Sequence, residues 1–216
     1  MVSGRKARGI LALALVFGVT ALGFSFDVKS FPSPIKKGSI LISGGFGLGI
    51  YILPLSDIDD STSSSVLLGG TLAVDYALPI NFALTVGGEI GYSGSKLDAW
   101  DSDVDISLGE IPIIVRAAWH PNWEVKNLDT YLLVKVGYGI GLWTGDDIPD
   151  GVKIPHGIIA GFNIGVRYFF VPAFGAFVET GYEYHMLRFK EEDSSITYTY
   201  TSIGSKFVTL GVTFRL

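Results

Sequence analysis

The sequence predicts an all-β fold, an eight-stranded antiparallel up-and-down transmembrane β-barrel, from three observations. In eight successive segments, apolar residues alternate with small or polar ones, and the connections between segments alternate between long and short. Mean hydropathy is positive, although no apolar run beyond residue 23 approaches the length of a spanning helix. A membrane barrel explains this combination, because only every second residue of each strand faces lipid.

The first 23 residues have the pattern of a secretory signal peptide. Three basic residues within positions 5–8 precede an apolar run from Ile10 to Gly23, which is short for a membrane anchor of about 20 spanning residues. We expect cleavage after Gly23 or Ser25, which removes the three basic residues and changes the formal charge from −5 to −8. Residues 24–37 are then a polar periplasmic lead-in, and residues 38–216 form one barrel domain.

Eight strands follow the lead-in, and the last of them closes on the first. They are predicted at Gly38–Leu53, Ser65–Leu78, Asn81–Ser93, Leu108–His120, Thr130–Thr144, Gly157–Phe170, Ala173–Phe189 and Ser202–Leu216. The long connections are Pro54–Ser64, Gly94–Ser107, Gly145–His156 and Lys190–Thr201, and the shorter ones are Pro79–Ile80, Pro121–Asp129 and Val171–Pro172. Bacterial barrels have short periplasmic turns and long external loops. We therefore expect an outer-membrane location with periplasmic termini and extracellular long loops.

The alternation assigns a face to each residue. In the fifth strand, Leu132, Val134 and Val136 point towards lipid, and Lys135 and Gly137 point into the lumen. A soluble lipocalin-like barrel is the alternative, but it would place the polar residues outside and the apolar ones inside. Inward glycines, as at residues 45–49 and 137–141, leave room for longer side chains across a narrow lumen.

The same alternation places charged residues inside the barrel. They are Asp75, Glu89, Glu110, Arg116, Lys135, Arg167, Glu179, Glu183, His185 and Arg215. Charges at low dielectric must be paired, so one interpretation is a salt-bridge network that plugs the lumen. The other is a polar constriction that selects a permeant. Glu89, Glu110, Glu183 and His185 are expected nearer the outside, with little cationic balance.

Composition and motifs argue against several other classes of function. The chain has no cysteine, which excludes disulfides, thiolate metal sites and an acylated N-terminal cysteine. An acidic chain without basic clusters argues against nucleic acid as a partner. The acidic run Asp101–Asp105 resembles a calcium loop, but Ile106 and Pro112 stand where glycine and glutamate are required. Neither a metal, nor a cofactor, nor an enzymatic activity is predicted.

The whole mature chain resembles the small eight-stranded bacterial outer-membrane proteins, a group that includes OmpX, the OmpA barrel and OmpW. The resemblance rests on the turns Ala77–Leu84 and Phe169–Phe177, the closing strand with Phe214, and an OmpW-like opening at Gly38–Pro54. Leu216 stands where the family usually ends in an aromatic residue. The resemblance implies outer-membrane lipids and the barrel-assembly machinery as partners.

Two functions follow as hypotheses. The OmpW-like resemblance implies a narrow channel or transporter for small hydrophobic molecules. A hydrophobic pocket for such a ligand near the first long loop would be lined by Leu53, Leu55, Ile58, Val66 and Leu67. The alternative is a surface-exposed adhesin or structural barrel, whose acidic external loops and Ser/Thr/Tyr-rich tract at Ser194–Ser202 contact host surface molecules.

Overall fold

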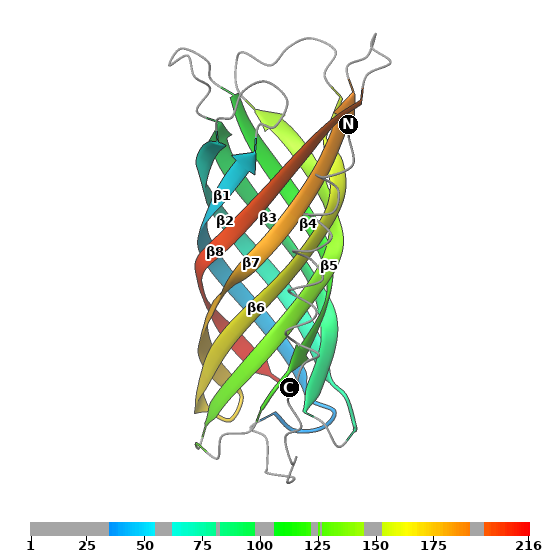
Figure 1. Cartoon of the computed structure of the whole chain (residues 1–216). Helices are drawn as coiled ribbons and strands as arrows, with labels where there is room; N and C mark the ends of the chain where they lie inside the picture. Colours follow the sequence, from blue (N-terminus) through cyan, green and yellow to red (C-terminus); the bar gives the residue numbers. More distant parts are fainter. Residues whose placement is uncertain are drawn as a thin grey trace, which may run out of the picture. The chain divides into compact units, whose positions relative to one another are not determined.

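The computed structural model contains a closed barrel in which every strand pairs antiparallel with its neighbours in the chain, and the eighth pairs with the first (Figure 1). The structure describes residues 35–54, 62–80, 83–97, 106–121, 125, 127–144, 153–190 and 197–216. The predicted signal peptide and most of the lead-in lie outside these residues. No helix within the described ranges is long and apolar enough to cross a membrane.

All eight predicted strands are present. They are β1 (Ile40–Pro54), β2 (Thr62–Ala77), β3 (Leu84–Leu97), β4 (Ile106–Trp119), β5 (Leu128–Thr144), β6 (His156–Val171), β7 (Phe174–Lys190) and β8 (Thr197–Arg215). The short connections join β2 to β3, β4 to β5 and β6 to β7 at one end of the barrel, which we call the turn end. The long connections lie at the opposite, loop end. Strands of 14–19 residues exceed the 9–11 that cross a bilayer.

Several strands extend further at the loop end than the sequence predicts. β2 begins at Thr62 instead of Ser65, β3 ends at Leu97 instead of Ser93, and β8 begins at Thr197 instead of Ser202. These extensions are rich in Ser, Thr and Tyr, so they lack the apolar alternation by which the other strands are detected. Thr and Tyr nevertheless favour strands, and the neighbouring strand supplies hydrogen-bonding partners. Part of the predicted Ser/Thr/Tyr-rich loop is therefore strand β8, paired with β7.

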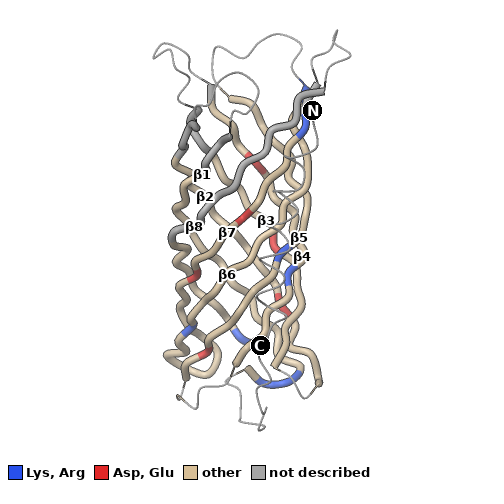
Figure 2. The backbone as a smooth tube through the Cα atoms, viewed as in Figure 1, with Lys and Arg blue, Asp and Glu red and all other residues tan. Residues whose placement is uncertain are grey.

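The two faces of the barrel wall have opposite character, as the alternation predicts. On β5, Val134, Val136 and Tyr138 are 44–57% exposed, whereas Leu133 and Lys135, which alternate with them, are buried. Figure 2 shows the charged residues as isolated points along the strands, separated by long uncharged stretches. An exposed apolar surface that surrounds a charged interior is the reverse of a soluble barrel. The soluble alternative is therefore wrong.

Interior glycines lie opposite the longest interior side chains. A Cβ atom at Gly165 would collide with the ring of Tyr131, and one at Gly139 would collide with the carboxylate of Glu110. A Cβ atom at Gly211 would meet the ring of Phe177. Because an eight-stranded barrel is only wide enough to be filled by side chains, each large residue needs a neighbouring position without one. The glycines therefore allow the interior to hold long charged and aromatic groups.

Candidate functional site

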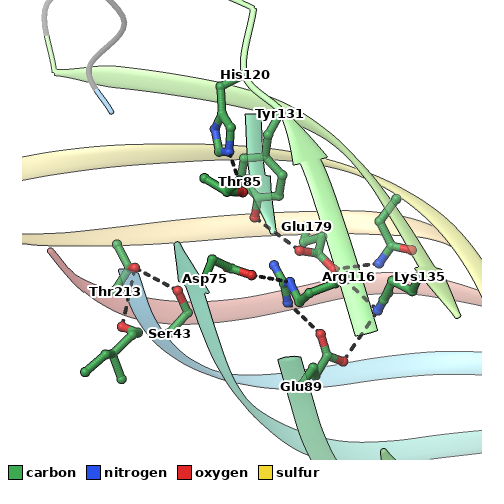
Figure 3. A network of polar contacts seen from close by, with 12 residues as sticks. Ser43, Asp75, Thr85, Glu89, Arg116, His120, Tyr131, Lys135, Glu179 and Thr213 are labelled. Atoms are coloured by element: carbon green, nitrogen blue, oxygen red, sulfur yellow. Dashed lines mark hydrogen bonds and ion pairs between the residues drawn. The ribbon is translucent and has the colours of Figure 1, made fainter. Parts of the chain in front are cut away.

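The charged interior is the candidate functional site, and all nine residues predicted for it lie there. Asp75, Glu89, Glu110, Arg116, Lys135, Arg167, Glu179, Glu183 and His185 are each 2–7% exposed. They come from β2, β3, β4, β5, β6 and β7, and the network that they form connects strands that are not neighbours in the sheet (Figure 3). We call this set, with the residues that bind to it, the inner network.

One part of the inner network lies near the turn end, and we call it the turn-end cluster. Its centre is Asp129, whose two carboxylate oxygens are both paired. Nδ1 of His120 lies 2.8 Å from Oδ1 of Asp129, and Nη1 of Arg167 donates to Oδ2 at 3.0 Å. On the other side of the imidazole ring, Nε2 of His120 lies 3.0 Å from the hydroxyl of Thr85. This carboxylate therefore fixes an imidazole and a guanidinium at once.

Glu179 is the second carboxylate of the turn-end cluster, and it too has both oxygens occupied. The hydroxyl of Tyr131 donates to Oε2 at 3.1 Å, and the side-chain amide of Asn163 donates to Oε1 at 2.6 Å. The guanidinium of Arg167 lies 5.0 Å from the centroid of the Tyr131 ring. This cation–π contact connects Glu179 and Asp129 through one aromatic side chain.

Lys135 and Arg116 form the centre of the inner network. Nζ of Lys135 lies 2.6 Å from Glu183, 3.5 Å from Glu89 and 3.8 Å from Glu179. Nη1 of Arg116 donates to Glu89 at 2.5 Å, and its Nε lies 3.1 Å from Asp75. Because Lys135 contacts carboxylates on both sides, it connects the turn-end cluster with the groups nearer the loops.

The loop-end cluster consists of Glu183, His185 and Glu110. Nδ1 of His185 lies 2.8 Å from Oε2 of Glu110, and its Nε2 lies 3.5 Å from Oε2 of Glu183. Oε1 of Glu110 is buried and has no hydrogen-bonding partner among the described residues. Glu89 and Glu183 bind Arg116 and Lys135, so our expectation of an outer acidic group with little cationic balance is wrong for these two residues.

The inner network has more acid than permanent base. Its six carboxylates are Asp75, Glu89, Glu110, Asp129, Glu179 and Glu183, and its permanent cations are Arg116, Lys135 and Arg167. With His120 and His185 neutral the network carries a formal charge of −3, and with both protonated it carries −1. Each carboxylate contacts at least one cationic or imidazole group, as low dielectric requires.

An apolar layer lies beside the turn-end cluster. Ile35, Leu41, Ala77 and Phe169 form one buried cluster, and each of them is 0–6% exposed. The guanidinium of Arg215, which the alternation also places inside, lies 4.4 Å from the centroid of the Phe169 ring. The turn end of the lumen is therefore filled by a charged layer and an apolar layer.

A small cavity lies beside the other part of the network. Its volume is about 20 Å³, and its walls include the glycine-rich segments of β1 and β2, the apolar residues Leu67 and Ile114, and the polar groups of Glu183, His185 and Thr209. The hydroxyl of Thr209 is buried and has no partner among the described residues. This volume is enough for a water molecule and too small for an organic ligand.

The predicted hydrophobic pocket does not form as one surface in the described residues. Val66 is 57% exposed on the outer face, whereas Leu67 is 8% exposed and faces the interior. Adjacent residues of a strand point to opposite faces, so these two cannot line one pocket. Leu55 and Ile58 lie outside the described residues, as does the side chain of Leu53.

Sequence reasoning missed several members of the turn-end cluster. The sequence places His120 at the last position of the fourth predicted strand and Asp129 in the turn that follows, and Thr85, Tyr131 and Asn163 carry no charge at neutral pH. Extending the alternation of β5 backwards from Tyr131 would have placed Asp129 inside. Thr85, His120 and Asp129 have the connectivity of a hydroxyl–imidazole–carboxylate triad, but each is only 1–2% exposed, so a substrate does not reach the hydroxyl. Among the described residues, no group of three ligating side chains is placed to hold a metal ion.

Known structures share this architecture. Neisserial surface protein A is 15% identical, with 82% of this chain and 99% of that one aligned at a TM-score of 0.51. The attachment invasion locus protein Ail of Yersinia pestis is 16% identical, with 84% and 100% aligned at a TM-score of 0.47. The outer membrane protein AlkL is 14% identical, with 90% and 97% aligned at a TM-score of 0.49. No protein-family model and no curated protein matches the chain. The chain thus has the fold of the small eight-stranded outer-membrane barrels.

Proposed function

We propose that this protein is an outer-membrane barrel with a closed lumen, which acts at its external end as a surface-exposed adhesin or structural barrel. The observation that carries the proposal is the inner network. Buried ion pairs join β2, β3, β4, β5, β6 and β7 across the lumen, and an apolar layer lies beside them. A filled lumen leaves the external surface as the place where the protein meets other molecules.

The placement in the membrane is supported by the outer face of the barrel. Large apolar side chains are exposed on every strand, among them Phe46, Leu72 and Val115 at 53–67%. Tyr168, Phe170, Phe174 and Phe214 form a row of ring contacts near the turn end, with centroids 5.1–6.1 Å apart. Aromatic rings of this kind favour the membrane–water boundary. With the long connections outside, β1 begins and β8 ends on the periplasmic side.

Conductance in a planar bilayer tests the closed lumen. We expect refolded protein to give no discrete current steps at neutral pH, because permeation would require separation of Lys135 from Glu183 and Arg116 from Glu89. The control uses the same preparation of refolded protein: a difference in its gel migration between heated and unheated samples shows that folded protein was added to the bilayer. Regular single-channel steps from verified protein would contradict the proposal.

Deletion of external loops tests the proposed role as an adhesin. Shortening the connections at residues 98–105 and 145–152 should abolish adhesion of expressing cells to host surfaces or matrix, with unchanged outer-membrane permeability. The matched control shortens the turn at residues 122–124, at the opposite end of the barrel. If adhesion survives the shortening of these two connections, they do not carry an adhesin function, and only the structural role would remain for them.

Exchange of small hydrophobic molecules is the second candidate. The one observation that bears on it is the cavity on the loop side of the network, with Leu67, Pro112 and Ile114 in its walls. At about 20 Å³ this cavity holds only a water molecule, so a hydrophobic solute would have to widen it on entry. A ligand that entered here would have to leave sideways into the membrane, because the turn end is filled. Under this function, Leu67→Asn should reduce uptake of a hydrophobic solute by cells, whereas under the first function uptake should not depend on the protein at all.

A further inference from the structure

The outer face of the barrel carries a pair of basic residues at its loop end. His156 is the first residue of β6 and is the cross-strand partner of Arg188 on β7, and both side chains are exposed. Cross-strand partners have their Cβ atoms about 4.5–5.5 Å apart. Arg188 is always charged and His156 is charged when protonated, so the two groups repel unless an anion lies between them.

Neighbouring strands provide no such anion in the same row. The residue opposite His156 on β5 is Ile140, and the residue opposite Arg188 on β8 is Thr199. A third basic residue, Lys153, is exposed only three residues before His156 in the chain. Within the described residues, no ion pair joins a carboxylate to any of these three basic residues.

His156 is also held in place by an aromatic residue. The hydroxyl of Tyr138 is hydrogen-bonded to Nδ1 of His156, and the two rings stack with centroids 5.8 Å apart. With Nδ1 occupied, Nε2 of His156 is the nitrogen that remains to face an external acceptor. Below the pair, the same face carries apolar residues such as Ile158, which is 48% exposed. The pair therefore lies on the loop side of these exposed apolar residues.

We propose that His156 and Arg188, with Lys153 nearby, bind the phosphate group of an anionic lipid in the leaflet at the loop end. Arginine and imidazole donors match phosphate oxygens, and the exposed apolar residues below the pair match the acyl chains of the same lipid. The proposal rests on the membrane placement proposed above. It adds a specific lipid contact on the outside of the barrel, independent of whether the lumen is open.

Native mass spectrometry of the refolded full-length chain tests this site, with phosphatidic acid, phosphatidylcholine or inorganic phosphate as the probe. We expect phosphatidic acid to be retained in preference to phosphatidylcholine, and inorganic phosphate not to be retained, because it lacks acyl chains. Arg188→Gln and His156→Gln should each lower the affinity for phosphatidic acid about fivefold, as expected for loss of one basic group beside an anionic lipid. Arg188→Lys, which keeps the charge, should retain most of it.

Lys36→Gln is the matched control, because Lys36 is an exposed cation at the turn end and its loss changes the net charge equally. An equal loss of affinity in this control would show a general charge effect and overturn the proposal. Equal retention of inorganic phosphate would identify a free anion instead of a lipid and would also overturn it. If the protein does not enter bilayers in the heat-modifiable form, the membrane placement itself fails. If the protein enters bilayers but all variants retain phosphatidic acid equally, the lipid site at His156 and Arg188 is wrong and the membrane placement stands.

Discussion

The two ends of the inner network differ in how completely their carboxylates are paired. In the turn-end cluster, both oxygens of Asp129 and both oxygens of Glu179 accept contacts from neighbouring side chains. In the loop-end cluster, Glu183 also has both oxygens in contact, with Lys135 and His185, but Glu110 has one oxygen bound to His185 and one without a partner in the described part of the chain. The turn end is not fully satisfied either, because Nε of Arg167 and Oδ1 of Asn163 are buried there without a hydrogen-bonding partner in the described residues. Its carboxylates are nevertheless held on every oxygen, so the turn end is the more rigid plug, whereas the loop end has a cavity with room for water.

The surroundings of the two clusters support the same distinction. The turn-end cluster lies beside an apolar layer in which Leu41 is fully buried. The loop-end cluster lies beside the 20 Å³ cavity, where the hydroxyl of Thr209 also lacks a partner in the described residues. A buried polar group without water or a partner costs about 1–3 kcal/mol, so a water molecule is the simplest occupant of this cavity.

The largest expected effect is at Asp129. Asp129→Ala removes the carboxylate between His120 and Arg167 and leaves a buried guanidinium without its partner, so we expect a loss of about 3–5 kcal/mol in the free energy of unfolding. Urea unfolding in lipid vesicles measures it. Glu110→Gln at the loop end is the comparison and should cost about 1 kcal/mol, because water can replace the lost contact. Equal losses in the two variants would remove the distinction between the two ends.

A glycine substitution should give the next largest effect. Gly165→Ala forces the ring of Tyr131 away from its position over β6 and disturbs its hydrogen bond to Glu179, with an expected destabilisation of about 1–3 kcal/mol. Gly44→Ala is the control, because the nearest atom to its added Cβ would be 4.0 Å away. The same urea titration compares them. A fully stable Gly165→Ala protein would mean that the turn-end cluster rearranges easily and is not rigid.

The smallest effect is expected at two threonines of β8. Thr213 is hydrogen-bonded to Ser43 at 2.7 Å, so Thr213→Val should cost about 1 kcal/mol. Thr209→Val removes a hydroxyl that has no partner among the described residues and can bind only the water expected in the cavity, which can leave or turn to other groups, so the free energy of unfolding should change by less than about 0.5 kcal/mol. A larger loss for Thr209→Val than for Thr213→Val would reveal a firmly bound ligand or water network in the cavity.

Much of this architecture follows from the sequence because alternation is a local property. The period of two determines which face each side chain occupies, so the charged interior around Lys135 could be predicted. The partners could not. Lys135 on β5 binds Glu183 on β7, and Glu110 on β4 binds His185 on β7, so these contacts cross the lumen between strands that are not neighbours. They depend on the stagger of the strands around the barrel, which alternation does not encode.

Irregular positions were also missed. Two register shifts involve β8, one with β1 between Leu48 and Gly49 and one with β7 between Glu179 and Gly181. A bulge of this kind moves one residue out of the alternation and has no single compositional signature. His120 was overlooked for a related reason, since it follows β4 immediately and the alternation ends there. Its buried role appears only when Thr85 and Asp129 are brought beside it.

The lack of charge on β1 has a consequence for how the barrel closes. No residue from Ile40 to Pro54 is ionisable at neutral pH, so no ion pair crosses the seam between β1 and β8, where Ser43 and Thr213 are hydrogen-bonded. The charged groups of β4 to β7 can therefore lose their hydration and form ion pairs with one another while this seam is still open. Closure is then left to backbone hydrogen bonds and small side chains, which makes the first and last strands the natural place for the wall to join during assembly.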